Sequence, residues 1–346
     1  MLIEGVTIRD AFSDGIDPDC CRRVRIANCD IESDDDALCL KASALLGVRG
    51  ATEGVVVSNC RMRSSSNCFK LGTESTGDFR QIVLSDCVFD GTTPADRDAS
   101  AAAEGGGIAL LMVDGGTIDG VTISNVVMRD VAAPLFVRLG NRGRDQEGAT
   151  PGRLRNVVIS GVTAVGATDT SPIAGLPGHR IEGVTIENVR IVTAGANWRR
   201  LPLDVPERPA RYPEVTMFGA LPSFGLYLRH ARDVTLRNVQ LSVEQPDVRP
   251  ALVADDVTGL HVVGFDGRPA EGDAPPVWLN NVRGGIVETS SATDEGRTIL
   301  RVTGEDTERI TLGGPADWTP ASIHRSHEVA PTAVAYATGP SEVVRR

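Results

Sequence analysis

A short strand pattern that recurs along the chain constrains the fold more than any other feature. Each copy alternates apolar and polar residues with a period of two, which predicts a β-strand. Asn, Asp or Gly stands four residues after the first apolar position of each copy. The copies are GVTIRD (5–10), RVRIANCDI (23–31), GVVVSNCRM (54–62), QIVLSDCVF (81–89), GVTISNVVM (120–128), NVVISGVTA (156–164), GVTIENVRI (183–191), DVTLRNVQL (233–241) and GLHVVGFDG (259–267).

The spacing of these copies indicates a solenoid. Successive copies begin 18, 31, 27, 39, 36, 27, 50 and 26 residues apart, which is typical of repeat proteins whose loops differ from coil to coil. Helical periodicity is absent, so repeats that contain helices do not fit. The pattern predicts an all-β protein, a single-stranded right-handed parallel β-helix of about nine or ten coils whose turn Asn residues stack as a ladder. A β-sandwich or a propeller is the alternative.

The composition agrees with a narrow interior. Hydrophobic residues make up 41% of the 346 residues but aromatic residues only 4%, so the core must be aliphatic. We expect one β-helix domain over residues 1–315, in which the Pro-rich stretch 196–223 is a long loop. We expect an irregular C-terminal tail over residues 316–346.

Charge and cysteine content limit the partners and the compartment. The net charge of -11 leaves no basic surplus to neutralise phosphates, so no nucleic-acid partner is expected. No apolar run approaches 18 residues, so no membrane partner is expected either. The seven Cys are odd in number and favour buried free thiols. With no signal peptide visible, this favours a cytoplasmic location, or a secreted one if the natural N-terminus is missing.

Two Asp-rich stretches lie about one coil apart. They are SDGIDPDCC (13–21) and SDDDALCLK (33–41), and Asp14 precedes Asp36 by 22 residues. Neighbouring strands are about 4.8 Å apart, so adjacent rungs would bring these carboxylates together, where like charges raise one another's pKa. Two solvated turns are the alternative, but a purely structural rung would avoid this repulsion. The arrangement therefore favours a reactive site.

The stretch 13–41 resembles the core of glycoside hydrolase family 28, the polygalacturonase group, in a divergent bacterial branch. The resemblance implies a pectin-lyase-like β-helix and places the family's catalytic carboxylates on Asp14, Asp35 and Asp36. It also implies inverting hydrolysis without a metal or other cofactor. Asp35 would protonate the leaving oxygen, while Asp14 and Asp36 would hold and deprotonate the attacking water. Such a mechanism needs roughly 6.5–9.5 Å between acid and base carboxyls.

Two positions depart from the family pattern. Asn67 stands where the family has His, and Gly140 replaces the Lys of the Arg-Ile-Lys motif. An Arg fork recognises a carboxylate well, and the Arg of that motif is kept. The substrate-binding residues that we expect are Asn67, Lys70, Glu74, Arg138 and Arg142. The alternatives are a solvated strand Lys, a turn Glu and a basic surface loop.

We therefore expect a glycoside hydrolase that cleaves α-linked, acidic sugars of the galacturonic type in pectin-like cell-wall polysaccharide or oligosaccharide. One alternative is a carbohydrate-binding β-helix that has lost turnover, which Asn67 and Gly140 favour. Another is a Ca²⁺-dependent polysaccharide lyase whose Asp clusters hold the ion. Family members have more coils before the first catalytic Asp. We therefore expect missing N-terminal coils, or a homo-oligomer whose second copy covers the exposed strand edge.

Overall fold

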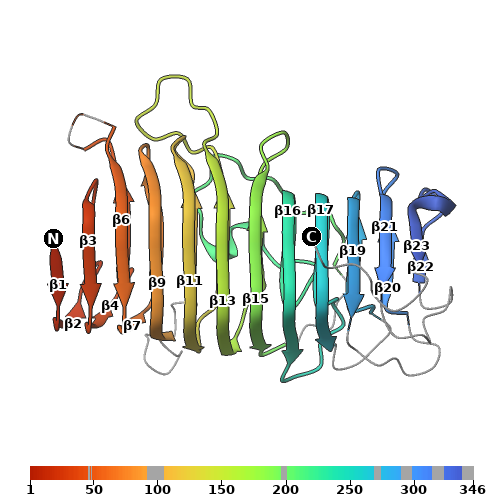
Figure 1. Ribbon diagram of the computed structural model, residues 1–346, viewed down its shortest axis with the longest axis horizontal. Coiled ribbons are helices and arrows are strands. Elements are labelled where there is room, and N and C mark those ends of the chain that lie inside the picture. The colour runs from red at the N-terminus through yellow and green to blue at the C-terminus, as the bar shows by residue number, and fades with distance from the viewer. Residues whose placement is uncertain are drawn as a thin grey trace, which may run out of the picture.

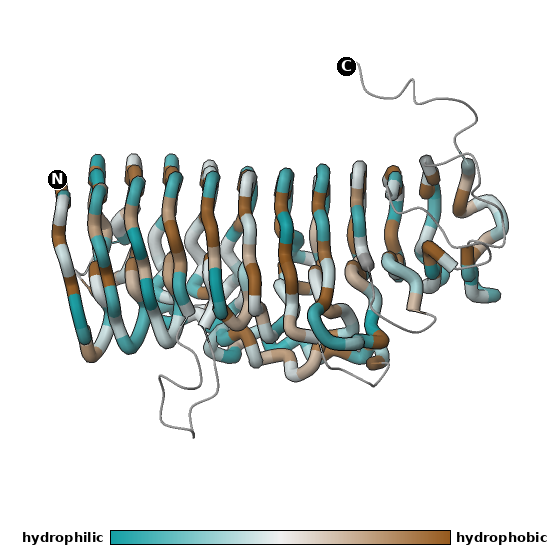
Figure 2. The backbone as a smooth tube through the Cα atoms, turned by 90° about the horizontal axis from the view of Figure 1, so that it is seen from below, coloured by the Kyte–Doolittle hydropathy of each residue, from teal (hydrophilic) through white to brown (hydrophobic). Residues whose placement is uncertain are grey.

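The computed structural model shows a parallel β-helix, as the repeats predicted (Figures 1 and 2). Along most of its strands apolar side chains alternate with polar ones and point into a continuous interior. Among the described residues, no helix is long and apolar enough to cross a membrane. The structure describes residues 1–45, 47, 49–91, 105–195, 201–268, 274–289, 298–313 and 323–336.

One column of parallel strands runs the length of the β-helix and is the row visible in Figure 1. Within the described residues it has twelve rungs. This exceeds the expected number of about nine or ten, because the C-terminal coils lack the repeated motif. The strands are β1 (Leu2–Glu4), β3 (Arg22–Ala27), β6 (Ala51–Ser58), β9 (Asp78–Gly91), β11 (Thr117–Arg129), β13 (Arg153–Ala167), β15 (Ile181–Thr193), β16 (Leu226–Val243), β17 (Leu252–Arg268), β19 (Arg283–Thr289), β21 (Glu308–Gly313) and β23 (Val334–Tyr336).

A second column, which we call the site sheet, stacks in parallel on another side of the coil. The first parts of β16 and β17 belong to it. Its other strands are β5 (Leu38–Ala42), β8 (Phe69–Ser75), β10 (Gly106–Met112), β12 (Ala133–Leu139), β14 (Ser171–Ala174), β18 (Val277–Asn280), β20 (Leu300–Thr303) and β22 (Ile323–Arg325). The short strands β2 (Thr7–Ala11), β4 (Asp30–Ser33) and β7 (Arg61–Ser64) begin the remaining side.

Residues in the left-handed region bend most of the coils at two corners. In β11, Gly120 has φ 78° and Asn125 has φ 53°, five residues later, and both favour this region. The same five-residue spacing separates Gly54 from Asn59, with φ of 66° and 52°. The predicted Asn ladder is confirmed where Asn59 Nδ2 donates to the Oδ1 of Asn28 on the previous rung at 2.7 Å. Several strands, such as β11, are therefore long and bent, whereas the sequence pattern predicted short ones.

Most of the interior is made of aliphatic side chains, as the composition predicted, but the same core also contains Phe69, Phe79, Phe89, Phe224 and Phe265. The prediction of a purely aliphatic core is therefore wrong. Cys29, Cys60 and Cys87 stack within this core and are at most 3% exposed. All seven Cys are free thiols. The column of Cys residues is therefore part of the packing, as expected.

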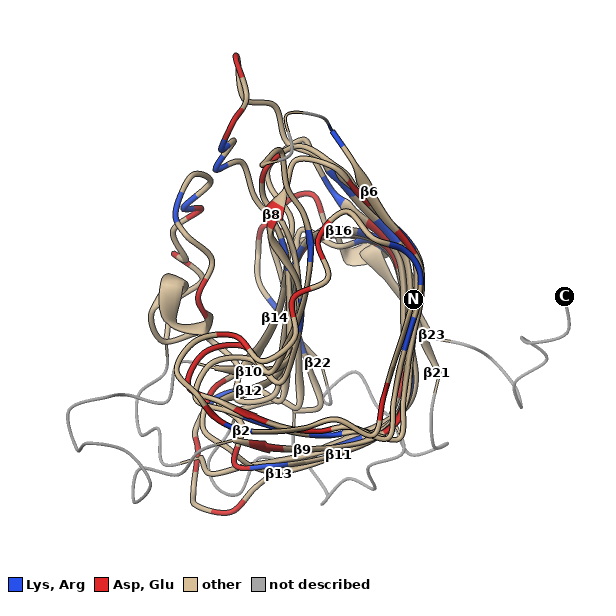
Figure 3. Cartoon of the chain, turned by 90° about the vertical axis from the view of Figure 1, so that its left-hand side faces the viewer, with Lys and Arg blue, Asp and Glu red and all other residues tan. Residues whose placement is uncertain are grey.

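A covering segment, residues 201–222, packs on the outer face of the site sheet. It contains the short 3-10 helix η1 (Val215–Phe218). Its apolar side chains form a second buried cluster with outward residues of the sheet, including Phe136 and Tyr227. Seen along the stack, this segment lies outside the wall that β8 and β14 form (Figure 3). The Pro-rich stretch is thus an ordered outer layer from residue 201 on.

The two ends of the stack differ. Near the N-terminus, Leu2 and Phe12 are 61% and 92% exposed. At the other end, β22 pairs with β20 and β23 pairs with β21. A short 3-10 helix, η3 (Pro331–Ala333), precedes β23. The parallel pairing therefore continues beyond residue 315, where the sequence led us to expect the repeat to end.

Candidate active site

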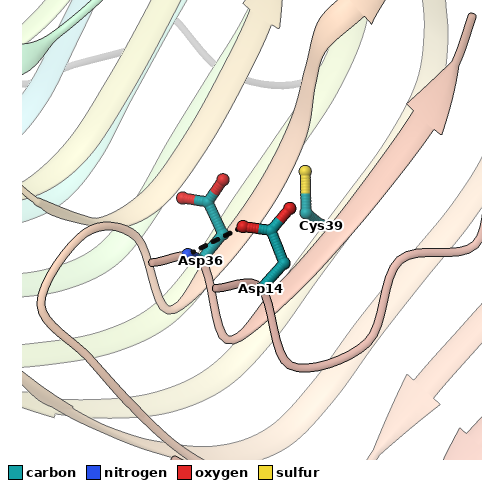
Figure 4. A group of neighbouring side chains, drawn as sticks. All are labelled: Asp14, Asp36 and Cys39. Carbon is teal, nitrogen blue, oxygen red and sulfur yellow. Dashed lines mark hydrogen bonds between the residues drawn. The ribbon is translucent and has the colours of Figure 1, made fainter. Parts of the chain in front are cut away.

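The coil length brings the three predicted carboxylates together at the start of the site sheet. Ile16 pairs in parallel with Leu38, so Asp14 lies beside Asp36, as Figure 4 shows. The backbone N–H of Asp36 donates to Asp35 Oδ1 at 2.9 Å and to Asp14 Oδ1 at 3.3 Å. The prediction that the two Asp-rich stretches meet on adjacent rungs is confirmed.

One oxygen of the proposed acid and one oxygen of the proposed base lie close together. Because Asp35 Oδ1 and Asp14 Oδ1 lie 2.9 Å and 3.3 Å from one nitrogen, they are at most 6.2 Å apart. An inverting pair has roughly 6.5–9.5 Å between its two carboxyl groups, which is a different distance from the one between these two oxygens. The geometry of these two oxygens therefore does not by itself favour inversion.

Asp36 is the buried member of the group and is only 2% exposed. Its Oδ1 accepts hydrogen bonds from Asn67 Nδ2 at 2.7 Å and from the Ser66 hydroxyl at 3.2 Å. Its Oδ2 accepts from Lys70 Nζ at 2.6 Å. Burial opposes the charge on Lys70, but the Asp36 carboxylate outweighs it and raises the pKa of Lys70. Lys70 therefore stays protonated, and these contacts fix the position of the Asp36 side chain.

Asp14 shares a second Lys with Asp17. Lys41 Nζ donates to Asp14 Oδ2 at 2.7 Å and also to Asp17. Burial raises the pKa of Asp14, but hydrogen bonds with Asp17 and Lys41 outweigh it and lower that pKa. Burial and the bond to Asp14 raise the pKa of Asp17 to about 7. Asp14 is thus held as the anion, with its side chain 14% exposed.

Asp35 is the exposed member of the group. Its backbone carbonyl accepts from the hydroxyls of Ser33 and Ser64, which fixes the chain and leaves the carboxyl group open to solvent. Partial removal from water raises its pKa, and the charges of Asp36 and Asp14 raise it further. A carboxyl group with a raised pKa beside one with a lowered pKa is the arrangement that acid–base catalysis requires.

Asn67 and Lys70 belong to this site, and both side chains contact Asp36. The Asn67 side chain donates to Asp36 and accepts from the N–H of Gly106 at 2.9 Å. Lys70 is 5% exposed, which excludes the solvated Lys considered as the alternative. Their contacts position Asp36; a direct contact with substrate stays a prediction.

The substrate-binding prediction for Arg138 is wrong in this structure. Arg138 is 1% exposed, and its guanidinium donates to the carbonyls of Gly175 at 2.9 Å and Glu207 at 2.7 Å. It also lies 5.1 Å from the centre of the Phe218 ring. Arg138 therefore holds the covering segment against the sheet and cannot reach a sugar.

Arg142 and Glu74 lie in a network around Asp114. Asp114 is fully buried and accepts from Arg142 Nε at 2.9 Å. Arg142 Nη2 also donates to the Thr73 carbonyl at 3.0 Å. Glu74 pairs with Arg144, whose side chain is 50% exposed. Arg144 is thus the member of this network with the most surface open to a ligand.

Tyr212, in the covering segment, is a site residue that sequence reasoning missed. Its ring centre lies 5.9 Å from Lys70 Nζ and 5.6 Å from the Arg142 guanidinium carbon, and the residue is 43% exposed. An exposed aromatic face beside carboxylates is a suitable surface for packing a sugar ring. The residue lies outside the repeats, so no periodic signal pointed to it.

A metal ion does not fit these residues as they stand. Among the described residues, Asp14, Asp36 and Cys39 place potential ligand atoms within 4.8 Å of one another. Both carboxylates already pair with Lys ammonium groups. Burial raises the pKa of Cys39, whereas a metal ligand must be a thiolate. A cation would have to displace both Lys side chains.

Comparisons with known proteins point to the polygalacturonase group. The endo-polygalacturonases of Pectobacterium carotovorum subsp. carotovorum and Pectobacterium parmentieri are 25% and 26% identical to this chain over 193 residues. Each alignment covers 54% of this chain and 42% of the relative, so the chain spans less than half the length of these relatives. No family model matches the chain.

Two solved structures give weaker matches. The exopolygalacturonase of Thermotoga maritima has a TM-score of 0.46 and 18% identity over 70% of this chain and 52% of that protein. The endo-xylogalacturonan hydrolase of Aspergillus tubingensis has a TM-score of 0.33 and 12% identity over 98% and 91%. The sequence relatives, together with the carboxylate motif, confirm that the chain resembles polygalacturonases.

Proposed function

We propose that this chain is a glycoside hydrolase that cleaves α-linked sugars of the galacturonic type in pectin-like polysaccharide or oligosaccharide. The observation that carries the proposal is the pair formed by Asp35 and Asp14. The pKa of the exposed carboxyl group of Asp35 is raised, while the pKa of Asp14 is lowered. A general acid and a general base need opposite shifts of this kind.

In the proposed reaction, Asp35 gives its proton to the glycosidic oxygen as the bond to the anomeric carbon breaks. A water molecule adds to that carbon and loses a proton to Asp14. Asp36 is enclosed by Lys70 and Asn67, so it helps to hold the water in place without taking the proton. The products are two shorter sugars.

The stereochemistry follows from the resemblance to an inverting family, while the short separation of the two oxygens argues for a direct test. NMR of the first product formed distinguishes the two outcomes. We expect the inverted anomer. A retained anomer would mean that Asp14 attacks the sugar directly, as a closer pair of carboxyls allows.

An acidic substrate is supported by the cations around Tyr212. Lys70 and Arg142 flank the ring, and Arg144 is half exposed next to Glu74. A guanidinium can bind a carboxylate with two parallel hydrogen bonds. We propose that Tyr212 packs against the sugar ring while Arg144 pairs with its carboxylate.

The test is release of reducing ends from galacturonic oligosaccharides by the wild type, Asp35→Asn and Asp34→Asn, with and without EDTA. Asp34 is the matched control, because it is an exposed Asp directly before Asp35. Loss of the general acid should reduce the rate by about 10²- to 10⁴-fold, while Asp34→Asn should stay close to wild type. EDTA should have no effect.

Each other outcome identifies an alternative. Release that EDTA abolishes, with an unsaturated product, would support the Ca²⁺-dependent lyase. Binding of oligosaccharides without release by the folded wild type would support the carbohydrate-binding protein. Equal loss in Asp34→Asn and Asp35→Asn would argue against Asp35 as the acid.

A further inference from the structure

The covering segment closes the outer face of the site sheet on one side of the carboxylates. Outward residues of the later strands are buried beneath it: Phe136 on β12 is 1% exposed, and Tyr227 on β16 and Val253 on β17 are 0% exposed. From the segment, Val215, Met217, Phe218 and Leu221 pack against them. A ligand cannot bind to this part of the sheet while the segment is in place.

Hydrogen bonds fasten the covering segment along its length. The Glu207 carbonyl accepts from Arg138 at 2.7 Å, and the Pro209 carbonyl accepts from the N–H of Asn141 at 2.7 Å. At the two ends, the Val205 carbonyl accepts from Arg229 at 2.6 Å and the Leu221 carbonyl from Arg249 at 3.2 Å. Because the segment also buries its apolar side against the sheet, it is held in place along its length. We call it the wall of the site.

The edge of this wall lies close to the reactive carboxylates. Tyr212 approaches Lys70 on β8, and Lys70 contacts Asp36 directly. The next strands of the site sheet are β10 and β12, and their outward residues Ala109 and Phe136 are already buried in the cluster with the covering segment. Rungs of a sheet are about 4.8 Å apart, so the open face ends within about two rungs of the carboxylates.

We propose that the site cleaves near the end of a sugar chain because the covering segment blocks one side of the carboxylate site. This rests on the proposed hydrolysis of acidic sugars. A chain bound across Asp35 can extend away from the covering segment, toward the N-terminal end of the stack, but on the other side it meets Tyr212 and the segment behind it. Only a few sugar units fit on that side, so the enzyme releases short products from one end.

The test compares viscosity, reducing ends and product sizes during hydrolysis of long polygalacturonate by the wild-type protein. Cleavage near chain ends should give short oligosaccharides from the first time point, while viscosity falls slowly per bond broken. Intermediate sizes with a rapid loss of viscosity at a few per cent of bonds broken would overturn the proposal. Absence of release from both long and short substrates would instead contradict the proposed hydrolysis.

Variants test whether the wall sets this limit. Tyr212→Ala shortens the edge of the wall without touching its buried side, and should shift the shortest abundant product to a longer one. Tyr336→Ala is the matched control, since Tyr336 is 39% exposed on β23 at the far end of the stack. An unchanged product pattern in Tyr212→Ala, with both variants folded and active, would contradict the assignment of this edge as the boundary.

Discussion

The outward face of the site sheet has two regions that share one backbone arrangement. A line of paired residues passes through Cys39 and Lys70 next to the carboxylates, and continues through Phe136, Tyr227 and Val253 under the covering segment. Strand pairing is parallel throughout. The outward side chains, and the segment that packs on them, therefore decide whether a strand contributes to the candidate site or is buried in packing.

The largest expected effect is in the polar region, where Lys70→Met removes the partner of a buried carboxylate. The variant should lose about 3–5 kcal/mol of unfolding free energy, because Asp36 would stay buried without a compensating charge. Urea denaturation measures this. In the double variant Lys70→Met with Asp36→Leu most of the stability should return, since neither charge is then present. A double variant as unstable as the single one would show that packing, not charge, is what Lys70 provides.

In the covered region the corresponding change is Phe218→Ala, which removes an apolar side chain that packs on the sheet and on Arg138. Buried Phe-to-Ala changes cost about 3 kcal/mol or more, and cleavage by protease within residues 201–222 should become faster. Phe12→Ala is the control, because Phe12 is 92% exposed and its loss should change stability by less than about 0.5 kcal/mol. Equal losses in both variants would show that the segment is not held by its apolar side.

The smallest expected effect is a pH dependence in the polar region, because the Asp17 side chain is 32% exposed and water screens its interactions. The pKa of Asp17 is raised from 3.8 to about 7 in the folded protein, so its contribution to stability is complete below pH 3.8 and is lost as the pH rises through about 7. Asp14, whose pKa is lowered, contributes in the opposite sense, and its contribution is lost only below pH 3.8. Unfolding free energy should therefore decline from about pH 4 to pH 7.

Asp17→Asn checks this dependence. The variant should show a flatter profile of unfolding free energy over this pH range, since an amide does not titrate. Phe218→Ala should be less stable than wild type but keep the wild-type slope. The same slope in Asp17→Asn and wild type would show that other groups cause the decline.

Much of the fold followed from the sequence because its signals are local. Alternation of apolar residues predicts strands, and the recurring Asn marks a left-handed corner, as the φ of 52° at Asn59 confirms. The 22-residue interval between Asp14 and Asp36 is also a local signal. It equals the length of one coil, so it predicted that the two residues lie side by side.

The covering segment and its consequences could not be predicted in this way. Whether Arg138 is open to a substrate depends on a segment about 70 residues away, and Tyr212 reaches the site from outside the repeats. One signal was available, since IALLMV (108–113) and APLFVRL (133–139) lack alternation. Near-continuous apolar runs are typical of strands that are buried on both faces.

The constant five-residue spacing between the two corners has an evolutionary consequence. Gly54 and Asn59, or Gly120 and Asn125, turn the chain in the same way in different coils, although the copies begin between 18 and 50 residues apart. Insertions are therefore confined to the rest of the coil, which includes the side that carries the carboxylates and the covering segment. Such a protein can acquire a new specificity by exchanging one loop, while the stacking of every other rung is inherited unchanged.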